Sequence, residues 1–189
     1  MSAMLEREVK LRFRSAQEAR DAVLAIGATV VRERRLQDDA LFDNEREDLR
    51  QRRCALRLRR EGPQSYLTFK GPVQAGTMKL REELETAVAD ASVLQRVLEH
   101  LEMHVWFRYQ KYREEYALDG VVAAIDETPI GTFVELEGTE AGITEAAAAL
   151  GRTAADYVLD SYYGLFMKYR EALGFRGAHM IFDEPDRLT

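Results

Sequence analysis

The chain has 189 residues and a net charge of −6, and its composition is 46% hydrophobic and 32% charged. This length and composition are typical of one globular domain with a sizeable core. The acidic net charge disfavours nonspecific binding to nucleic acid. No apolar run is long enough for a transmembrane helix, no signal peptide is evident, and the single cysteine, Cys54, allows no internal disulfide. We therefore expect a cytoplasmic protein that binds neither nucleic acid nor membranes.

The first half of the chain predicts mainly strands. Residues 5–14 alternate apolar and charged positions, which is typical of a half-buried strand. A helix follows from Ser15, whose side chain is the N-cap, with Glu18 completing a capping box and Gly27 ending the helix. Residues 44–48 form a polar turn, and Gly62-Pro63 is a turn pair. The strands expected here are 5–14, 28–43, 54–61, 64–71 and 78–88.

The second half adds three strands and several helices. Residues 90–102 are expected to be helical, and Asp119-Gly120 is a strong hairpin signal. The strands expected here are 105–118, 121–127 and 130–138. The helical segments expected after them are 139–150 and one or two helices within 153–173. Residues 1–173 are therefore interpreted as a single domain, and residues 174–189 as a C-terminal tail without a clear period.

Eight strands joined mostly as hairpins, with helices inserted between them, predict an α+β fold. An eight-stranded sheet can close into a barrel that is wide enough for one small ligand. We therefore expect a closed antiparallel β-barrel with its helices packed outside.

The charged side chains of the strands recur in phase. On a single strand, such a face is usually exposed to water, and that interpretation stands for each strand alone. The same pattern over seven strands, with helices to cover the apolar face, favours a charged barrel interior. Buried charges are costly unless they are paired or coordinated. The carboxylate pairs are Glu6/Glu8, Glu83/Glu85 and Glu135/Glu137, joined by Asp126; the cations are Lys10, Arg57, Arg59, Lys70, Lys111 and Arg113.

These two sets of side chains suit one kind of ligand. Carboxylate oxygens are ligands for Mg²⁺ or Mn²⁺. Arginine and lysine match phosphate oxygens, arginine often with two hydrogen bonds. Metal and cations together neutralise charge on a reacting phosphoryl group.

The motifs also resemble a known family. Residues 6–10, Glu-Arg-Glu-Val-Lys, match the Glu-x-Glu-x-Lys signature of the CYTH superfamily, the triphosphate tunnel metalloenzymes. Further segments follow in the family's order, and the resemblance covers about residues 4–167. These segments are Leu-Phe-Asp at 41–43, Ala-Leu-Arg-Leu-Arg at 55–59, Leu-Thr-Phe-Lys-Gly at 67–71, Arg-Glu-Glu-Leu-Glu at 81–85, Lys-Tyr-Arg at 111–113 and Gly-Thr-Phe-Val-Glu-Leu-Glu at 131–137.

The resemblance implies an eight-stranded tunnel and a role for each residue. Glu83 and Glu85 would bind metal or position the attacking group, and with Lys70 they are the catalytic candidates. Ser161-Tyr162 resembles a short family motif, Lys168 is a candidate for an additional basic residue, and a homodimer is plausible. The implied metal ligands are Glu6, Glu8, Asp126, Glu135 and Glu137; the implied triphosphate-binding residues are Lys10, Arg57, Arg59, Lys70, Lys111 and Arg113.

Three functions compete. The leading hypothesis is a metal-dependent triphosphatase that acts on tripolyphosphate or an organic triphosphate. The alternative is a class IV adenylyl cyclase, which converts ATP to cyclic AMP and pyrophosphate. The third is a polyphosphate-binding module, which would not need so complete a set of carboxylates.

Other chemically suggestive residues are interpreted as structural. His100 and His104 straddle the expected end of a helix and lack the order of a zinc-protease motif. Cys54 has no evident catalytic partner. The loop at 71–76 lacks the Lys-Ser/Thr pair of a Walker-type phosphate loop. Tyr162, with its neighbouring aromatic residues, is expected in the core or at an interface.

Overall fold

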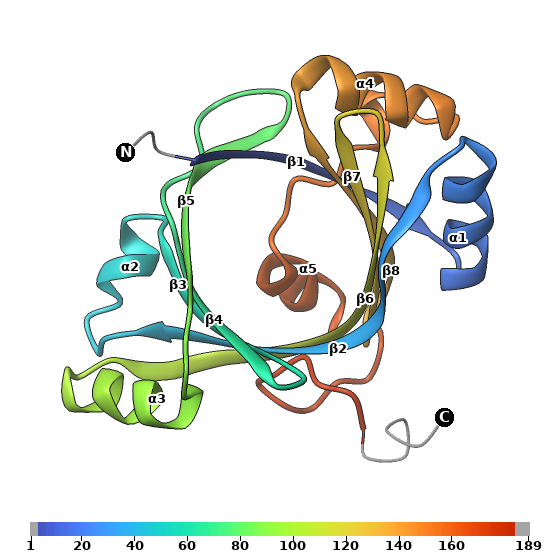
Figure 1. The fold of residues 1–189 in the computed structure, drawn as a ribbon. Coiled ribbons are helices and arrows are strands. Elements are labelled where there is room, and N and C mark those ends of the chain that lie inside the picture. The colour runs from blue at the N-terminus through green and yellow to red at the C-terminus, as the bar shows by residue number, and fades with distance from the viewer. Residues whose placement is uncertain (1–3, 184–189) are drawn as a thin grey trace.

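A computed structural model describes residues 4–183, and it confirms the predicted closed antiparallel barrel (Figure 1). The N-terminal strand closes the barrel because it pairs with β5 on one side and β8 on the other. Around the barrel the order is β1-β5-β4-β3-β2-β6-β7-β8. The strands are β1 Met4–Phe13, β2 Thr29–Asp43, β3 Ala55–Glu61, β4 Gln64–Lys70, β5 Lys79–Ala87, β6 His104–Leu118, β7 Val121–Thr128 and β8 Gly131–Gly138.

The longer helices begin at side-chain caps, as their sequences predict. Ser15 accepts a hydrogen bond from the Glu18 N–H, Asp90 from the Ser92 N–H, and Thr139 and Ser161 act in the same way. The helices are α1 Ala16–Ala25, α2 Asp48–Gln51, α3 Ala91–His100, α4 Glu140–Ala149, the 3₁₀ helix Ala154–Asp156 and α5 Tyr162–Tyr169. The predicted capping box differs in one detail, because the Glu18 carboxylate accepts from the N–H of Arg14.

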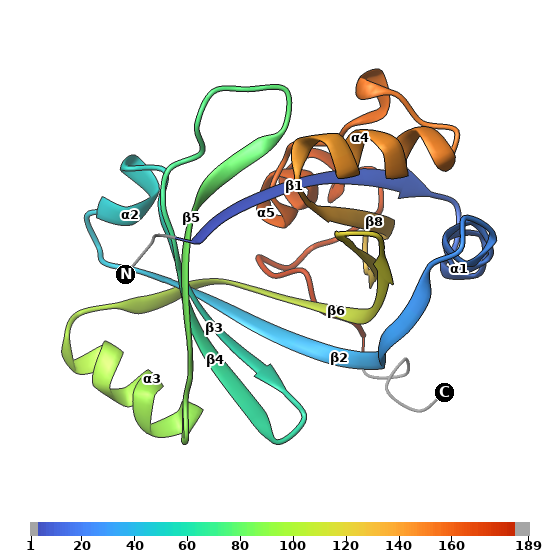
Figure 2. The ribbon, with the colours of Figure 1, turned by 45° about the horizontal axis from the view of Figure 1, so that its top comes forward.

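Two of the three apolar clusters lie on the outer side of the barrel wall. One cluster places α1 and α4 against β1, β7 and β8, with Val9, Leu11 and Ile143 almost fully buried. A second places α3 over β2 and β3 (Figure 2). Burial of this apolar surface is the main stabilising contribution to the fold. It also leaves the alternate, charged side chains of the strands facing inward.

The last helix and the segment after it complete the barrel. In Figure 1, α5 lies within the ring of strands, and the third apolar cluster packs it against β6 and β8. Beyond α5, Met180 is fully buried, and its carbonyl accepts from the N–H of Gln110 at 2.8 Å. The Met180 N–H donates to the carbonyl of Arg108 at 3.0 Å. The described part of the predicted tail therefore lies along β6; residues 184–189 are outside the described range.

The predicted hairpin turns form where expected. Asp119 and Gly120 join β6 to β7 with φ values of 25° and 75°, and Gly62 has φ 56° between β3 and β4. The polar segment after β2 gains more structure than the turn that the sequence predicts. Helix α2 forms because the Asp43 carboxylate accepts the N–H groups of Leu49 and Arg50. Across residues 4–183, the helices are too short or too polar to cross a bilayer.

Candidate active site

The strand register brings opposite charges together on the inner face of the barrel. Six cross-strand neighbours each pair a carboxylate with a cation, and each pair also makes a direct side-chain contact. Directly opposed pairs of this kind stabilise a sheet. The pairs are Glu6 with Arg81, Glu8 with Lys79, Lys10 with Glu135, Asp39 with Arg59, Lys70 with Glu83, and Arg113 with Asp126.

These side chains surround one cavity of about 370 Å³. The structure thus brings together twelve of the thirteen site residues predicted from the sequence, and the exception is Asp126. The predicted residues that line the cavity are Glu6, Glu8, Lys10, Arg57, Arg59, Lys70, Glu83, Glu85, Lys111, Arg113, Glu135 and Glu137. This geometry agrees with the predicted placement, while the chemical role of each residue stays a prediction.

One side of the cavity is rich in carboxylates. Lys70 lies 2.9 Å from Glu6 and 2.5 Å from Glu83. Burial would raise the pKa of Glu6, but the charges of Lys70 and Arg81 outweigh it and lower that pKa to about 2. Glu137 has no cation as its cross-strand neighbour on β1, because its register partner is Glu8. Partial burial, followed by the charges of Glu6 and Glu8, raises the pKa of Glu137 to about 7.

Cations occupy the more buried part of the cavity. Lys10 is 2% exposed and lies 3.1 Å from Glu8 and 3.2 Å from Glu135. Burial opposes its charge, yet Glu135 and Glu8 together raise the pKa of Lys10 above its ordinary value. Lys111 behaves differently, because burial and then the charge of Arg113 lower its pKa to about 8. Lys10 is therefore a fixed positive charge on the path of an entering anion.

Two arginines of β3 extend this cationic region. Arg59 donates two hydrogen bonds to the carboxylate of Asp39, at 2.8 and 3.2 Å. Arg57 donates to the hydroxyl of Thr68 at 3.0 Å, and its Nε has no hydrogen-bond acceptor among the described residues. This Nε is itself buried and lies 3.5 Å from Oδ1 of Asp39, while the Arg57 side chain lines the cavity, where its guanidinium charge can meet a bound anion.

Asp126 lies behind the cavity wall. It is fully buried on β7 and accepts hydrogen bonds from Lys111 at 2.8 Å and from Arg113 at 2.6 Å. The hydroxyl of Tyr162, the first residue of α5, donates to the same carboxylate at 2.6 Å. Tyr162 was expected in the core or at an interface; it lies in the apolar core cluster of α5, and it also lines the cavity.

Sequence reasoning missed several lining residues. Lys79 and Arg81 share the phase of Glu83 on β5, so the alternation that identified Glu83 contained the signal for both. Asp39 sits in a polar stretch of β2 where Asp38 precedes it, and only the structure shows which of the two points inward. The lining residues outside the predicted set include Leu41, Ala55, Lys79, Arg81, Tyr109, Ser161, Tyr162 and Tyr163.

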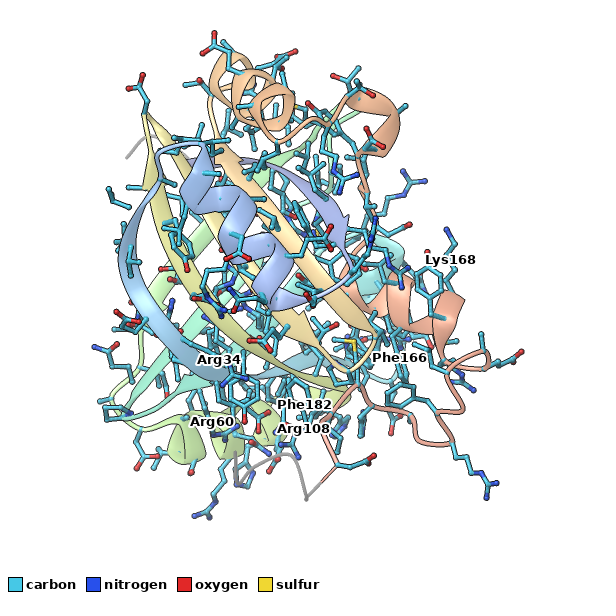
Figure 3. All side chains as sticks on the ribbon, turned by 90° about the vertical axis from the view of Figure 1, so that its right-hand side faces the viewer. Arg34, Arg60, Arg108, Phe166, Lys168 and Phe182 are labelled. Carbon is cyan, nitrogen blue, oxygen red and sulfur yellow. The ribbon has the colours of Figure 1, made fainter. Side chains whose placement is uncertain are left out.

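Apart from Tyr162, the residues set aside as structural remain outside the cavity. His100 ends α3 and His104 begins β6, and both side chains are exposed. Cys54 is buried and reduced. Lys168 extends away from the body of the protein (Figure 3), and its ammonium group lies 5.5 Å from the ring centroid of Tyr169. The candidate role of Lys168 in the cavity thus finds no support in its position.

The carboxylates have the chemistry of a divalent-metal site. Hard oxygen donors from Glu6, Glu8, Glu135 and Glu137 line one cavity, and Glu137 lacks a strong cationic partner. Within residues 4–183, no three acidic, histidine or cysteine side chains are already arranged around one metal position. Glu6 and Glu8 face Lys70, Lys10 and Lys79 instead. The donor set fits Mg²⁺ or Mn²⁺, provided that these ion pairs rearrange when the metal binds.

Known proteins resemble this chain in sequence. The family model described as "CYTH domain" matches residues 4–162. A curated protein of Methanocaldococcus jannaschii named "Putative adenylate cyclase" is 28% identical over 143 residues, which are 75% of this chain and 81% of that protein.

Solved structures show the same fold. A "putative adenylate cyclase" from Vibrio parahaemolyticus has a TM-score of 0.76 at 21% identity, covering 88% of this chain and 99% of that one. A Hippeastrum protein described as a "putative adenylyl cyclase" with a dominant triphosphatase activity has a TM-score of 0.64 at 21% identity, covering 87% of this chain and 95% of that one.

Proposed function

The chain belongs to the CYTH domain family, and on that premise we propose that it is a divalent-metal-dependent triphosphatase. Its substrate is inorganic tripolyphosphate or an organic triphosphate, and water is the attacking group. The observation that carries this proposal is the single cavity of about 370 Å³, whose wall holds six predicted phosphate-binding cations and six carboxylates.

The cations account for recognition of a polyanion. Lys10, Lys111 and Arg59 approach the cavity from three different strands, so they surround a bound chain of phosphates instead of contacting one side. Each is held by a carboxylate of the wall. Their side chains are therefore already oriented before the substrate arrives, which lowers the entropic cost of binding.

The metal role is assigned to carboxylates of β1 and β8. Mg²⁺ or Mn²⁺ held by Glu6, Glu8, Glu135 and Glu137 would neutralise charge on the phosphoryl oxygens and orient the chain. Asp126, the fifth ligand that the family resemblance implies, can bind metal only if its buried hydrogen bonds break.

The chain's own residues position the reaction. Lys70, held between Glu6 and Glu83, directs its charge toward a phosphate at the carboxylate-rich side of the cavity. Burial, with a hydrogen bond to Glu6, raises the pKa of Glu83, which makes it a better proton acceptor than an ordinary carboxylate. In the proposed step, water forms a P–O bond, Glu83 or Glu85 takes its proton, and the phosphoanhydride P–O bond breaks. The remaining phosphate chain leaves with the bonding electrons.

A cyclase is the second candidate, and one observation favours it. Leu41, Ala55 and Tyr163 form an apolar part of the cavity lining, on which an organic group attached to the triphosphate could rest. The cyclase name of the curated relative agrees with this alternative. In that reaction, a ribose 3′-hydroxyl attacks the α-phosphate of ATP and pyrophosphate leaves.

One experiment distinguishes these functions. Purified protein is incubated with Mg²⁺ or Mn²⁺ and tripolyphosphate, thiamine triphosphate or ATP, and the products are identified by ion chromatography. Phosphate release supports the triphosphatase, whereas cyclic AMP with pyrophosphate supports the cyclase. The Glu6→Gln/Glu8→Gln double variant should lose turnover, and Lys168→Ala, on the outer surface, is the matched control. Tight binding without any turnover would reject both enzymatic proposals in favour of a binding module.

A further inference from the structure

Both carboxylate oxygens of Asp126 are already engaged by hydrogen bonds from cations or from Tyr162. Its Oδ1 accepts from Arg113 Nε at 2.6 Å, and its Oδ2 accepts from Lys111, Arg113 and Tyr162 at 2.8, 2.6 and 2.6 Å. The residue has no exposed surface. A metal ligand at this position would have to give up charge-assisted bonds in a buried place, where their loss is expensive.

Asp39 repeats the arrangement on the neighbouring part of the wall. It is also fully buried, it accepts two hydrogen bonds from Arg59, and it lies 3.5 Å from Nε of Arg57. Neither Asp39 nor Asp126 lines the cavity, yet the two carboxylates together contact Arg57, Arg59, Lys111 and Arg113. Carboxylates outside the cavity lining thus orient four of the six predicted phosphate-binding side chains.

Tyr162 connects α5 to this second layer. Its hydroxyl bonds to Asp126, while its ring centroid lies 4.9 Å from the ammonium nitrogen of Lys111 and 5.4 Å from that of Lys10. An aromatic face at these distances attracts both cations. The Ser161 side chain caps α5 by accepting from the Gly164 N–H at 3.1 Å, which fixes the start of the helix next to the ring.

We propose that Asp126 and Asp39 are positioning residues that hold the phosphate-binding cations, that Tyr162 locks Asp126 in place, and that neither aspartate binds the metal. This inference rests on the proposed function, since it assigns cations to phosphate and glutamates to metal. It revises the role that family resemblance implies for Asp126. Metal binding then falls to the glutamates of β1 and β8, whose side chains line the cavity.

Two binding measurements separate positioning from metal ligation. Mn²⁺ affinity is measured by electron paramagnetic resonance without substrate. Tripolyphosphate affinity is measured by isothermal titration calorimetry in EDTA, where no metal can contribute. Tyr162→Phe keeps the ring and removes only the hydroxyl; Asp126→Asn removes the charge. Tyr169→Phe, on the same helix and outside the cavity lining, is the matched control.

Tyr162→Phe should weaken tripolyphosphate binding about tenfold, the lower end of the effect of losing one hydrogen bond to a charged group. Its Mn²⁺ affinity should stay within about twofold of wild type, as should both affinities of Tyr169→Phe. Asp126→Asn, if it folds, should behave similarly, and its effect should not add to that of Tyr162→Phe because the two side chains share one bond.

The opposite pattern would overturn the inference: a tenfold loss of Mn²⁺ affinity in either variant with tripolyphosphate affinity retained. Unchanged binding of both ligands in Tyr162→Phe would also overturn it. Failure of the wild-type protein to bind either ligand would instead remove the proposed function on which the inference rests. The wild-type measurement therefore distinguishes the two failures.

Discussion

The ammonium nitrogen of Lys70 lies 2.9 Å from both carboxylate oxygens of Glu6. The same ammonium group also donates to Glu83, so a lysine already occupies both oxygens of Glu6, one of the proposed metal ligands. Lysine and metal compete for the same oxygens, so binding of a metal releases the ammonium group toward a phosphate. We expect binding of metal and of substrate to be coupled through this residue.

Replacing Lys70 with methionine should have opposite effects on metal binding and turnover. Without the ammonium group, both oxygens of Glu6 lose their lysine partner, so Mn²⁺ should bind several-fold more tightly in the absence of substrate. Turnover should fall about 10²-fold or more, as it does when one preorganised charge-stabilising donor is removed. Electron paramagnetic resonance and phosphate release measure the two effects. Unchanged Mn²⁺ affinity would show that lysine and metal do not compete.

Glu8→Gln should destabilise the fold as well as impair turnover. Glu8 is 5% exposed and contacts both Lys10 and Lys79, so its loss leaves two buried ammonium groups with less compensation. Breaking a buried pair in this way costs about 3–5 kcal/mol. Urea unfolding should show a lower midpoint than for Glu85→Gln, a change on an exposed carboxylate of the same cavity. Equal midpoints would show that the lysines find other partners.

The stability of the protein should fall as pH rises because of Glu137. Its pKa in the folded chain, about 7, lies above the 4.5 of an ordinary glutamate. The folded state therefore holds this proton more tightly, and the resulting stability is present below pH 4.5 and is lost as pH rises through 7. Solvent at the exposed side chain screens part of the effect. Glu137→Gln should flatten the decline between pH 5 and 8 in thermal melts, and a parallel decline in both proteins would contradict the assignment.

Arg57→Lys should weaken substrate binding while the charge is kept. Lysine cannot replace the planar donors of Arg57, including the Nε that has no acceptor in the described structure. Losing one charge-assisted bond of about 1.5 kcal/mol corresponds to an approximately tenfold rise in KM for tripolyphosphate. Arg60→Lys on the same strand, outside the cavity lining, is the control. Equal KM values for the two variants would show that only the charge of Arg57 matters.

Met180→Ala should destabilise the protein by loosening the apolar cluster around α5. Met180 is fully buried against the apolar cluster of α5 and β6, and replacing a buried methionine with alanine costs about 2–5 kcal/mol. Urea unfolding checks the value, with Met167→Ala, a partly exposed methionine of α5, as the control. Equal losses in both variants would mean that the segment after α5 contributes little.

The barrel could be predicted from the sequence because the alternation within each strand is a local pattern. Alternation along each strand identified which side chains share a face, and this was enough to select Glu83 and Lys70. It could not reveal which strands are neighbours, and the register alone gives Lys10 its partner Glu135 and leaves Glu137 opposite Glu8. The sequence therefore does not distinguish Glu135, which has a cation opposite it, from Glu137, which does not.

Contacts between segments that are far apart in the sequence could not be predicted either. Tyr162 begins a short helix whose aromatic residues resemble an ordinary core stripe, and its bond to Asp126 joins α5 to β7. Family resemblance implies that Asp126 binds metal, and the sequence alone does not distinguish a buried, hydrogen-bonded aspartate from one that coordinates a metal. Asp39 was missed because adjacent aspartates at 38 and 39 point to opposite sides of β2.

The position of β1 between β5 and β8 has a consequence for the order of folding. The strand that carries Glu6, Glu8 and Lys10 is synthesised first, but one of its two partners, β8, ends at Gly138. Such non-local pairing is slow because a long loop must close before the contact forms. Until then, the β2–β3–β4–β5 meander and the β6–β7 hairpin can form with their charged faces in water, where the charges cost nothing. Burial of the charged interior therefore requires β1 to pair with β5 and β8, and the pairing with β8 brings Lys10 opposite Glu135.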